Sequence, residues 1–164
     1  MNSAAPLKLL ALDNEDLGII SAHCQDAILR VGDIIWSPAN KRFAVAMNRF
    51  AWEEVAANGR RSRSFERRRA ALHFDRVLSV KAVGIDRRAT NRILELLAVN
   101  FTAAAKDEPA GEIRLIFAGG AEIALSVEVI EAQLADLGAA WQTKAMPAHD
   151  LADRPGAASL PPVK

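Results

Sequence analysis

The chain has 164 residues, of which 51% are hydrophobic and 25% are charged, and its 21 basic and 20 acidic side chains leave a net charge of +1. These values exclude a chain that is disordered throughout, because disorder requires low hydrophobicity and a high net charge. The length suits one domain with a core, and the single cysteine, Cys24, excludes an internal disulfide and a zinc site built on cysteines.

The first part of the chain predicts one helix followed by short strands. Residues 7–12 form an apolar run that suits an edge or covering strand. Asp13 then offers a helix N-cap, and an apolar stripe at steps of three and four predicts an amphipathic helix at about 14–26, namely Leu17, Ile20, Cys24 and Ile28. Turn residues at 32–33 and 38–40 separate three strands that we expect at residues 29–31, 34–37 and 42–48.

The middle of the chain predicts a loop and then longer strands. We expect an exposed loop at residues 53–66, because Asn58-Gly59 is a turn signal and the Arg/Ser run is too polar to bury. A long half-buried strand follows over residues 70–82, bent or bulged near Asp75–Arg76. Residues 93–101 fit a helix or a strand, and we favour a strand for 97–101. Residues 113–117 and 122–127 flank Gly119-Gly120 and predict a β-hairpin.

The last predicted element is a helix at about 128–137. It rests on apolar residues at offsets 0, 3, 7, 10 and 14, which are Val127, Ile130, Leu134, Leu137 and Trp141. The prolines that follow disfavour another packed element. We therefore expect a single domain at residues 1–141 and a tail at residues 142–164.

The order of these elements predicts the α+β class. We expect a mainly antiparallel sheet, bent or closed into a partial barrel, with an N-terminal helix and a closing C-terminal helix. This order resembles the pleckstrin-homology-like superfold, an analogy that implies no ligand by itself.

Charge is distributed unevenly along the chain. Residues 60–92 hold 11 basic and 3 acidic side chains, whereas residues 1–59 hold 5 and 7, and residues 93–164 hold 5 and 10. The densest arginines are Arg60, Arg61, Arg63, Arg67, Arg68 and Arg69. This run is interpreted as a solvated loop, as a docking surface for an acidic protein or an anionic small molecule, or as a nucleic-acid site. A pI of about 8.0 and a single aromatic residue in the run, Phe65, disfavour nucleic acid.

The candidate binding residues are Arg67, Arg68, Arg69, His73, Asp75 and Arg76. On a strand, His73 and Asp75 project from one face about 7 Å apart, where the carboxylate could hold a charged histidine or orient an arginine that binds an anion. The alternative is a polar pair on a solvated face. Cys24 lies on the apolar stripe of the predicted helix, so we interpret it as a packing residue.

No catalytic motif accompanies these residues. The sequence lacks a nucleophile elbow and a phosphate-binding loop, and the segment His23-Cys24-Gln25-Asp26 offers one turn of ligands, too few for a metal site. We therefore predict no catalytic residue, metal or cofactor.

The function that these patterns favour is a non-enzymatic interaction module that presents a basic Arg-rich loop and strand to an acidic partner. The alternatives are a small enzyme or ligand-binding protein that uses His73, Asp75 and nearby arginines, and a weak nucleic-acid binder. A deep pocket beside His73 would favour the former alternative, and a flat basic surface would favour the module. The sequence shows neither a membrane-spanning run nor a signal peptide, so we expect a cytoplasmic protein.

Five stretches of the sequence resemble domain-of-unknown-function family 2948, a family of alphaproteobacterial proteins. They begin at Leu7-Lys-Leu-Leu-Ala-Leu-Asp13 and continue through 16–27, 43–53, Arg67-Arg-Arg-Ala-Ala-Leu-His-Phe-Asp-Arg-Val77 and 141–150. The resemblance covers residues 7–150 and implies a small cytoplasmic bacterial protein with no established activity. It transfers no catalytic or binding residue.

Overall fold

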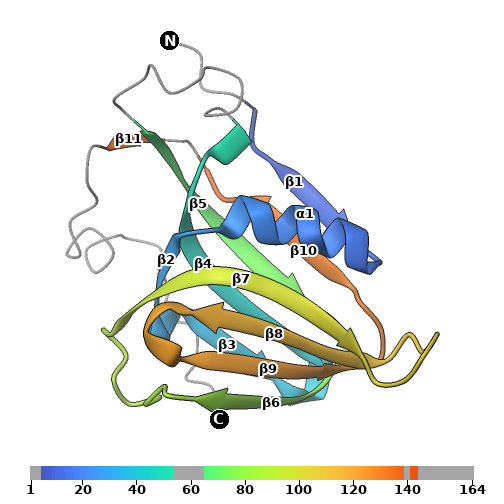
Figure 1. The fold of residues 1–164 in the computed structure, drawn as a ribbon. Helices are drawn as coiled ribbons and strands as arrows, with labels where there is room; N and C mark the ends of the chain where they lie inside the picture. Colours follow the sequence, from blue (N-terminus) through green and yellow to red (C-terminus); the bar gives the residue numbers. More distant parts are fainter. Residues whose placement is uncertain (1–4, 54–64, 139–140, 144–164) are drawn as a thin grey trace.

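The computed structural model describes residues 5–53, 65–138 and 141–143. They form one strongly bent antiparallel sheet, and the α-helix α1 (Asn14–Cys24) packs against it (Figure 1). The strands are β1 (Lys8–Ala11), β2 (Ala27–Arg30), β3 (Ile34–Ser37), β4 (Arg42–Phe50), β5 (Phe65–Phe74), β6 (Val77–Val83), β7 (Ile93–Ala103), β8 (Gly111–Phe117), β9 (Glu122–Val127), β10 (Ala132–Asp136) and β11 (Trp141–Thr143).

The sheet is not closed into a barrel. Its strands follow the order β1-β10-β5-β4-β2-β7-β8-β9-β6, with β3 added beside β4 and β11 beside β5. Every pair is antiparallel, which agrees with the predicted class of sheet. In Figure 1 the sheet curves so that β3 lies behind β8 and β9.

The predicted N-terminal helix is confirmed as α1. The side chain of Asp13 caps it by accepting a hydrogen bond from the backbone N–H of Asp16, at 2.8 Å. Its buried stripe of Leu17, Ile20 and Cys24 packs into the core beside β7 and β1. With 11 residues α1 is far too short to cross a membrane. No helix of the described residues is both long enough and apolar enough to do so.

The β8–β9 hairpin is also confirmed, and it supplies one wall of the core. Alternate residues of both strands point inward and are at most 2% exposed, namely Ile113, Leu115, Phe117, Ile123, Leu125 and Val127. Gly119 and Gly120 adopt positive φ angles of 82° and 87° in the turn, a conformation that glycine reaches without steric cost. The predicted strands at 7–12, 34–37, 42–48 and 97–101 correspond to β1, β3, β4 and β7, and β7 also includes residues 93–96, for which a helix was the alternative.

The predicted C-terminal helix is wrong, because this segment forms strand β10. Its backbone pairs with β1 on one side and with β5 on the other. Ile130, Ala132 and Leu134 are buried at steps of two, whereas Leu137, which the helical stripe included, is 49% exposed. Buried residues therefore alternate along the strand as far as Leu134, and Leu137 lies at the surface beyond the end of β10. The analogy to the pleckstrin-homology-like superfold depended on this predicted helix, so the analogy is not supported.

The long strand predicted over residues 70–82 is divided at the place where a bend was expected. Arg76 has a left-handed φ of 62°, and the chain leaves β5, which pairs with β4 and β10, to begin β6, which pairs with β9. At the C-terminal end, β11 pairs with β5, so the sheet continues to Thr143. Residues 54–64 of the predicted loop and residues 144–164 of the predicted tail lie outside the described residues.

Candidate functional site

The bent sheet is open between β3 and β6. In the described part of the chain β3 pairs with β4 and β6 pairs with β9, and neither strand has a partner on its other edge. At one end the two sides are joined, because Val77 donates a backbone hydrogen bond to the carbonyl of Lys41 at 2.9 Å. The Lys41 ammonium also pairs with Glu128 at 2.7 Å.

A cavity of about 320 Å³ lies at this opening. Ile34 and Phe43 line one side, and Val80 and Ile123 line the other. The lining continues to exposed residues of the segment between β6 and β7, including Thr90 and Asn91. The cavity therefore has an apolar interior and a polar mouth that faces solvent.

The segment that forms the mouth, residues 84–92, is fixed by backbone hydrogen bonds. Val31 donates to the carbonyl of Arg92 at 3.0 Å, and Gly32 donates to the carbonyl of Thr90 at 2.9 Å. A Cβ atom at Gly32 would lie 3.0 Å from that Thr90 oxygen, so the glycine permits this close approach. The Arg92 guanidinium closes the segment by donating to the carbonyl of Gly84 at 2.6 Å.

Asp33 and Arg30 form a polar part of the cavity lining, and Arg69 contacts Asp33. Asp33 is 2% exposed, and its Oδ2 lies 3.5 Å from Nε of Arg30 and 3.5 Å from Nη2 of Arg69. Arg30 and Asp33 both line the cavity. Nε of Arg30 is buried and makes no hydrogen bond with the described residues. The turn pattern at residues 32–33 predicted a change of direction here but gave no sign of this cluster.

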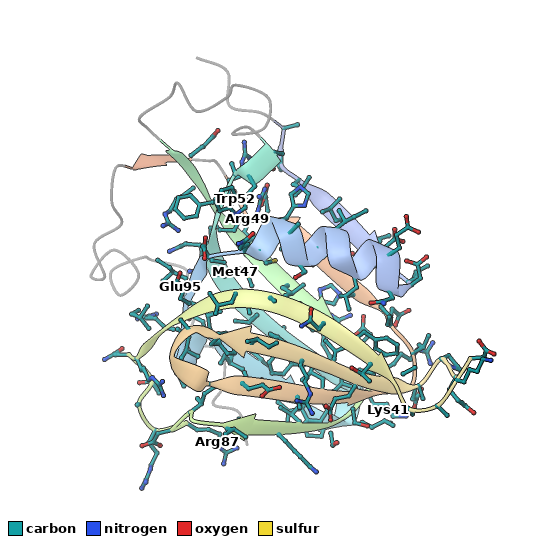
Figure 2. The ribbon with its side chains drawn as sticks, viewed as in Figure 1. Lys41, Met47, Arg49, Trp52, Arg87 and Glu95 are labelled. Carbon is teal, nitrogen blue, oxygen red and sulfur yellow. The ribbon has the colours of Figure 1, made fainter. Side chains whose placement is uncertain are left out.

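Arg87 is a further cation of the lining and lies in the segment between β6 and β7 (Figure 2). Its side chain is exposed, and the described residues provide it with no hydrogen bond or ion pair. The five other arginines of the described chain that are classed as exposed all have a partner: Arg42, Arg76, Arg88, Arg92 and Arg114.

The arginines predicted as an exposed binding surface on β5 are largely buried, which corrects the expectation that this run stays in solvent. Arg67 is 7% exposed, and its guanidinium lies 3.7 Å from the ring centroid of Phe50. Burial lowers the pKa of Arg67, while the charges of Asp26 and Glu95 oppose this shift. Arg68 is 2% exposed and pairs with Glu66 at 3.4 Å and with Asp136 at 3.6 Å. Arg67 and Arg68 do not line the cavity, whereas Arg69 contacts its Asp33.

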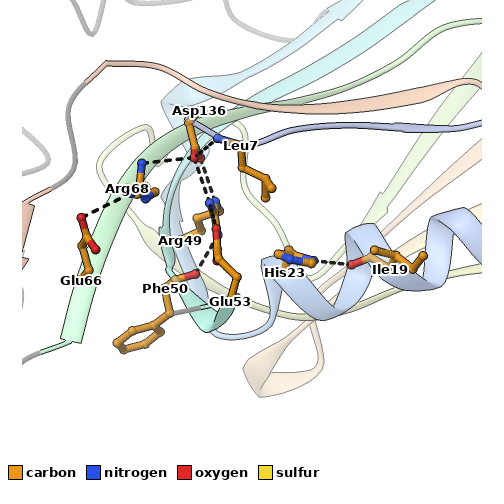
Figure 3. A network of polar contacts seen from close by, with 9 residues as sticks. All are labelled: Leu7, Ile19, His23, Arg49, Phe50, Glu53, Glu66, Arg68 and Asp136. Atoms are coloured by element: carbon orange, nitrogen blue, oxygen red, sulfur yellow. Dashed lines mark hydrogen bonds and ion pairs between the residues drawn. The ribbon is translucent and has the colours of Figure 1, made fainter. Parts of the chain in front are cut away.

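Arg68 belongs to a buried network that joins β4, β5 and β10 to Leu7, the residue before β1 (Figure 3). At its centre the Arg49 guanidinium, 0% exposed, donates to both oxygens of Asp136 at 2.8 and 2.9 Å and to both oxygens of Glu53 at 2.9 and 2.8 Å. Asp136 also accepts the backbone N–H of Leu7 at 2.8 Å. Burial disfavours the charged form of Arg49, but its bonds to Glu53 and Asp136 outweigh this effect and raise its pKa. The network explains how buried arginines are tolerated.

His73 and Asp75 lie together, as predicted, but neither residue lines the cavity between β3 and β6. Nε2 of His73 is 3.6 Å from Oδ2 of Asp75, and Arg42 donates to the two Asp75 oxygens at 2.7 and 3.2 Å. Burial and the charge of Arg42 lower the pKa of His73, against the opposing charges of Asp75 and Glu131. Arg76 is 58% exposed and pairs with Glu131 at 3.6 Å. These residues therefore form a surface cluster at the end of β5.

Cys24 is buried at 0% exposure, which confirms its predicted packing role. Burial raises the pKa of its thiol to about 12, so the thiolate that a nucleophile requires is disfavoured. Among the described residues no three His, Cys, Asp or Glu side chains are grouped so that they could hold a metal ion.

The fold and the cavity define an α+β protein built on an open, bent antiparallel sheet. The chain belongs to the family described as "Protein of unknown function (DUF2948)", whose model matches residues 7–149. Comparisons with curated proteins and with solved structures find no match.

Proposed function

We propose that this chain is a non-enzymatic binding module that takes the apolar part of a small molecule into the cavity between β3 and β6. The cavity itself carries this proposal. Its volume of about 320 Å³ falls within the range of about 300–1,000 Å³ that small-ligand sites occupy. Buried apolar side chains with a few polar groups at the mouth are the usual composition of such sites.

The composition of the lining supports binding more than catalysis. Asp33 is the acidic residue among the described residues that line the cavity, and its carboxylate is already in contact with Arg30 and Arg69. A general base must lie within hydrogen-bond reach of the substrate, and neither His73 nor Asp75 lines the cavity. The alternative of a small enzyme that uses these two residues is therefore less well supported.

Docking of an acidic protein onto the arginine run is also less well supported, because Arg68 and Arg69 have carboxylate partners within the fold. Arg60, Arg61 and Arg63 lie outside the described residues, and their role stays a prediction.

We propose the cytoplasm as the place where the module acts, since the fold uses its Cys24 as a buried free thiol and requires no disulfide.

Titration with a neutral fluorescent probe, N-phenyl-1-naphthylamine, tests the proposal. We expect the probe to bind to the wild-type protein with enhanced emission. The substitution Ala82→Trp places a large side chain in the lining and should weaken binding at least about tenfold, which corresponds to about 1.4 kcal/mol. Val83→Trp is the matched control, because Val83 is 66% exposed on the same strand and does not line the cavity.

Two outcomes contradict the proposal. One is the absence of probe binding to a wild-type protein that unfolds cooperatively in urea. The other is equal affinity of the Ala82→Trp and Val83→Trp variants, which would place the probe elsewhere on the molecule.

A further inference from the structure

The cavity has an excess of positive charge at its polar side. Arg30 and Arg87 line it, and Asp33 is the acidic residue of the described lining. Asp33 is shared between Arg30 and Arg69, each 3.5 Å from the same oxygen. Two guanidinium groups thus line the cavity and a third, that of Arg69, contacts Asp33, against one carboxylate.

We infer that the ligand of this cavity carries an anionic group, such as a carboxylate or a phosphate, at one end of its apolar body, and that Arg30 and Arg87 bind this group. The inference rests on the proposed function and adds the chemical class of the ligand. It assigns the apolar body to the interior of the cavity, which Ile34 and Phe43 line from one side and Ile123 from the other.

Arg30 supplies a donor that the fold leaves unused. Its side chain is 15% exposed, and its Nε is buried, 3.5 Å from Asp33 but without a hydrogen bond among the described residues. A buried donor without an acceptor is costly, because it has lost its hydrogen bonds to water. An anionic oxygen in the cavity would give the Arg30 guanidinium an acceptor, and bonds between charged partners are stronger than neutral ones.

Arg87 supplies a second donor group at the mouth. The neighbouring arginine, Arg88, pairs with Asp86 at 3.5 Å and does not line the cavity. Arg87 lines the cavity and has no partner among the described residues, so its guanidinium is available to a ligand. Because the backbone bonds of Val31 and Gly32 fix the segment that carries Arg87, this cation is held near the opening.

A matched pair of probes tests the inference. 1-Anilinonaphthalene-8-sulfonate differs from the neutral probe N-phenyl-1-naphthylamine by its sulfonate, so the ratio of their affinities measures the contribution of the anion. We expect the sulfonate to bind at least about tenfold more tightly to the wild-type protein. Higher salt should reduce this ratio, because the mouth of the cavity is exposed to solvent.

Single charge removals locate the contact. Arg87→Gln should weaken binding of the sulfonate by about three- to fivefold and leave the neutral probe unchanged. Arg30→Gln should have the larger effect, about tenfold, because its contact is more buried. Arg88→Gln is the control, since it removes the same charge from the adjacent position outside the lining and should change neither affinity.

Displacement of the bound sulfonate then distinguishes the natural end groups. We expect octanoate or octyl phosphate to displace it at lower concentration than 1-octanol, and the better competitor identifies carboxylate or phosphate. Equal affinity of the two probes, or equal effects of Arg87→Gln and Arg88→Gln, would overturn the anionic ligand while leaving the proposed cavity function intact. Failure of both probes to bind would instead overturn the proposed function.

Discussion

The carboxylate of Asp136 holds two buried arginines and one backbone amide. It accepts from Arg49 and from the N–H of Leu7, and it lies 3.6 Å from Arg68. Its side chain is 0% exposed, so water cannot replace it as a partner of these groups. Removal of its charge would leave two guanidinium groups in the interior without their shared anion.

We therefore predict that Asp136→Asn lowers the free energy of unfolding by about 3–5 kcal/mol, the usual cost of removing one partner of a buried ion pair. Urea unfolding measures the change. Asp86→Asn is the control, because Asp86 pairs with Arg88 at the surface with 60% of its side chain exposed, and the expected loss is about 0–1 kcal/mol. Similar losses for the two variants would show that the network does not stabilise the fold.

His73 gives a prediction for pH. Burial and Arg42 lower its pKa in the folded protein below the ordinary value of 6.5, so the unfolded chain binds the proton more readily. The resulting stability is complete above about pH 6.5 and is lost as the pH falls toward the folded pKa. Between about pH 7.5 and pH 5.5, the wild-type protein should lose more unfolding free energy than the His73→Gln variant. An identical loss in the two proteins would contradict this prediction.

The burial of Arg67 and Arg68 shows where residue-level prediction fails. A run of arginines predicts a solvated surface, because an unpaired buried charge is costly. The charge of Arg68 is compensated by Asp136, which lies far away in the sequence, and the guanidinium of Arg67 stacks on Phe50 of a neighbouring strand. Neither partner is recognisable until the strand order is known. The pairing of His73 with Asp75 was predictable because both residues lie on one face of one strand.

At the level of elements, local patterns predicted most of the fold. The hairpin of β8 and β9 and the capped helix α1 each depend on residues close in sequence, so their signals are complete within short windows. Strand β10 differs, because Ala-Gln-Leu-Ala favours a helix locally. Its two neighbours, β1 and β5, satisfy its backbone on both edges, and this tertiary pairing overrides the local preference.

A pair of substitutions separates the strand from the helix at this position. Leu134 is 0% exposed, so Leu134→Ala should lower the free energy of unfolding by about 2–5 kcal/mol. Leu137 would share a buried helical stripe with Leu134, but in the strand it is 49% exposed, and Leu137→Ala should cost less than about 0.5 kcal/mol. A large loss of unfolding free energy for both variants in urea would indicate that this segment is a helix.

For the whole molecule, the cavity could not be predicted from the sequence. It requires β3 and β6 to face each other across the opening, with residues 84–92 placed at the mouth by the backbone of Val31 and Gly32. Arg30 ends β2, Asp33 lies in the turn that follows, and Arg87 lies in the segment between β6 and β7; the sequence analysis identified none of them as binding residues. The chain did signal an excess of positive charge over residues 60–92, the region that contains Arg87.

The distribution of charge over the molecule also predicts weak nucleic-acid binding. The net charge is +1, and Arg68, Arg69, Arg76 and Arg88 of the basic region are paired with carboxylates. Fluorescence anisotropy with single-stranded RNA, single-stranded DNA and duplex DNA at about 150 mM salt should give affinities no tighter than about micromolar. Nanomolar binding to any of the three would show that the arginine run recognises phosphates.

The bond between the Leu7 amide and Asp136 spans 129 residues, and it has a consequence for synthesis. Strand β1 finds its described strand partner in β10, so it cannot join the sheet until the ribosome has made nearly the whole domain. At roughly 5–20 residues per second, the first strand waits on the order of ten seconds for its neighbour. During this interval Arg49 lacks Asp136, and the edge of β5 that will pair with β10 has no partner strand. The nascent protein is therefore most exposed to aggregation just before its last strands emerge.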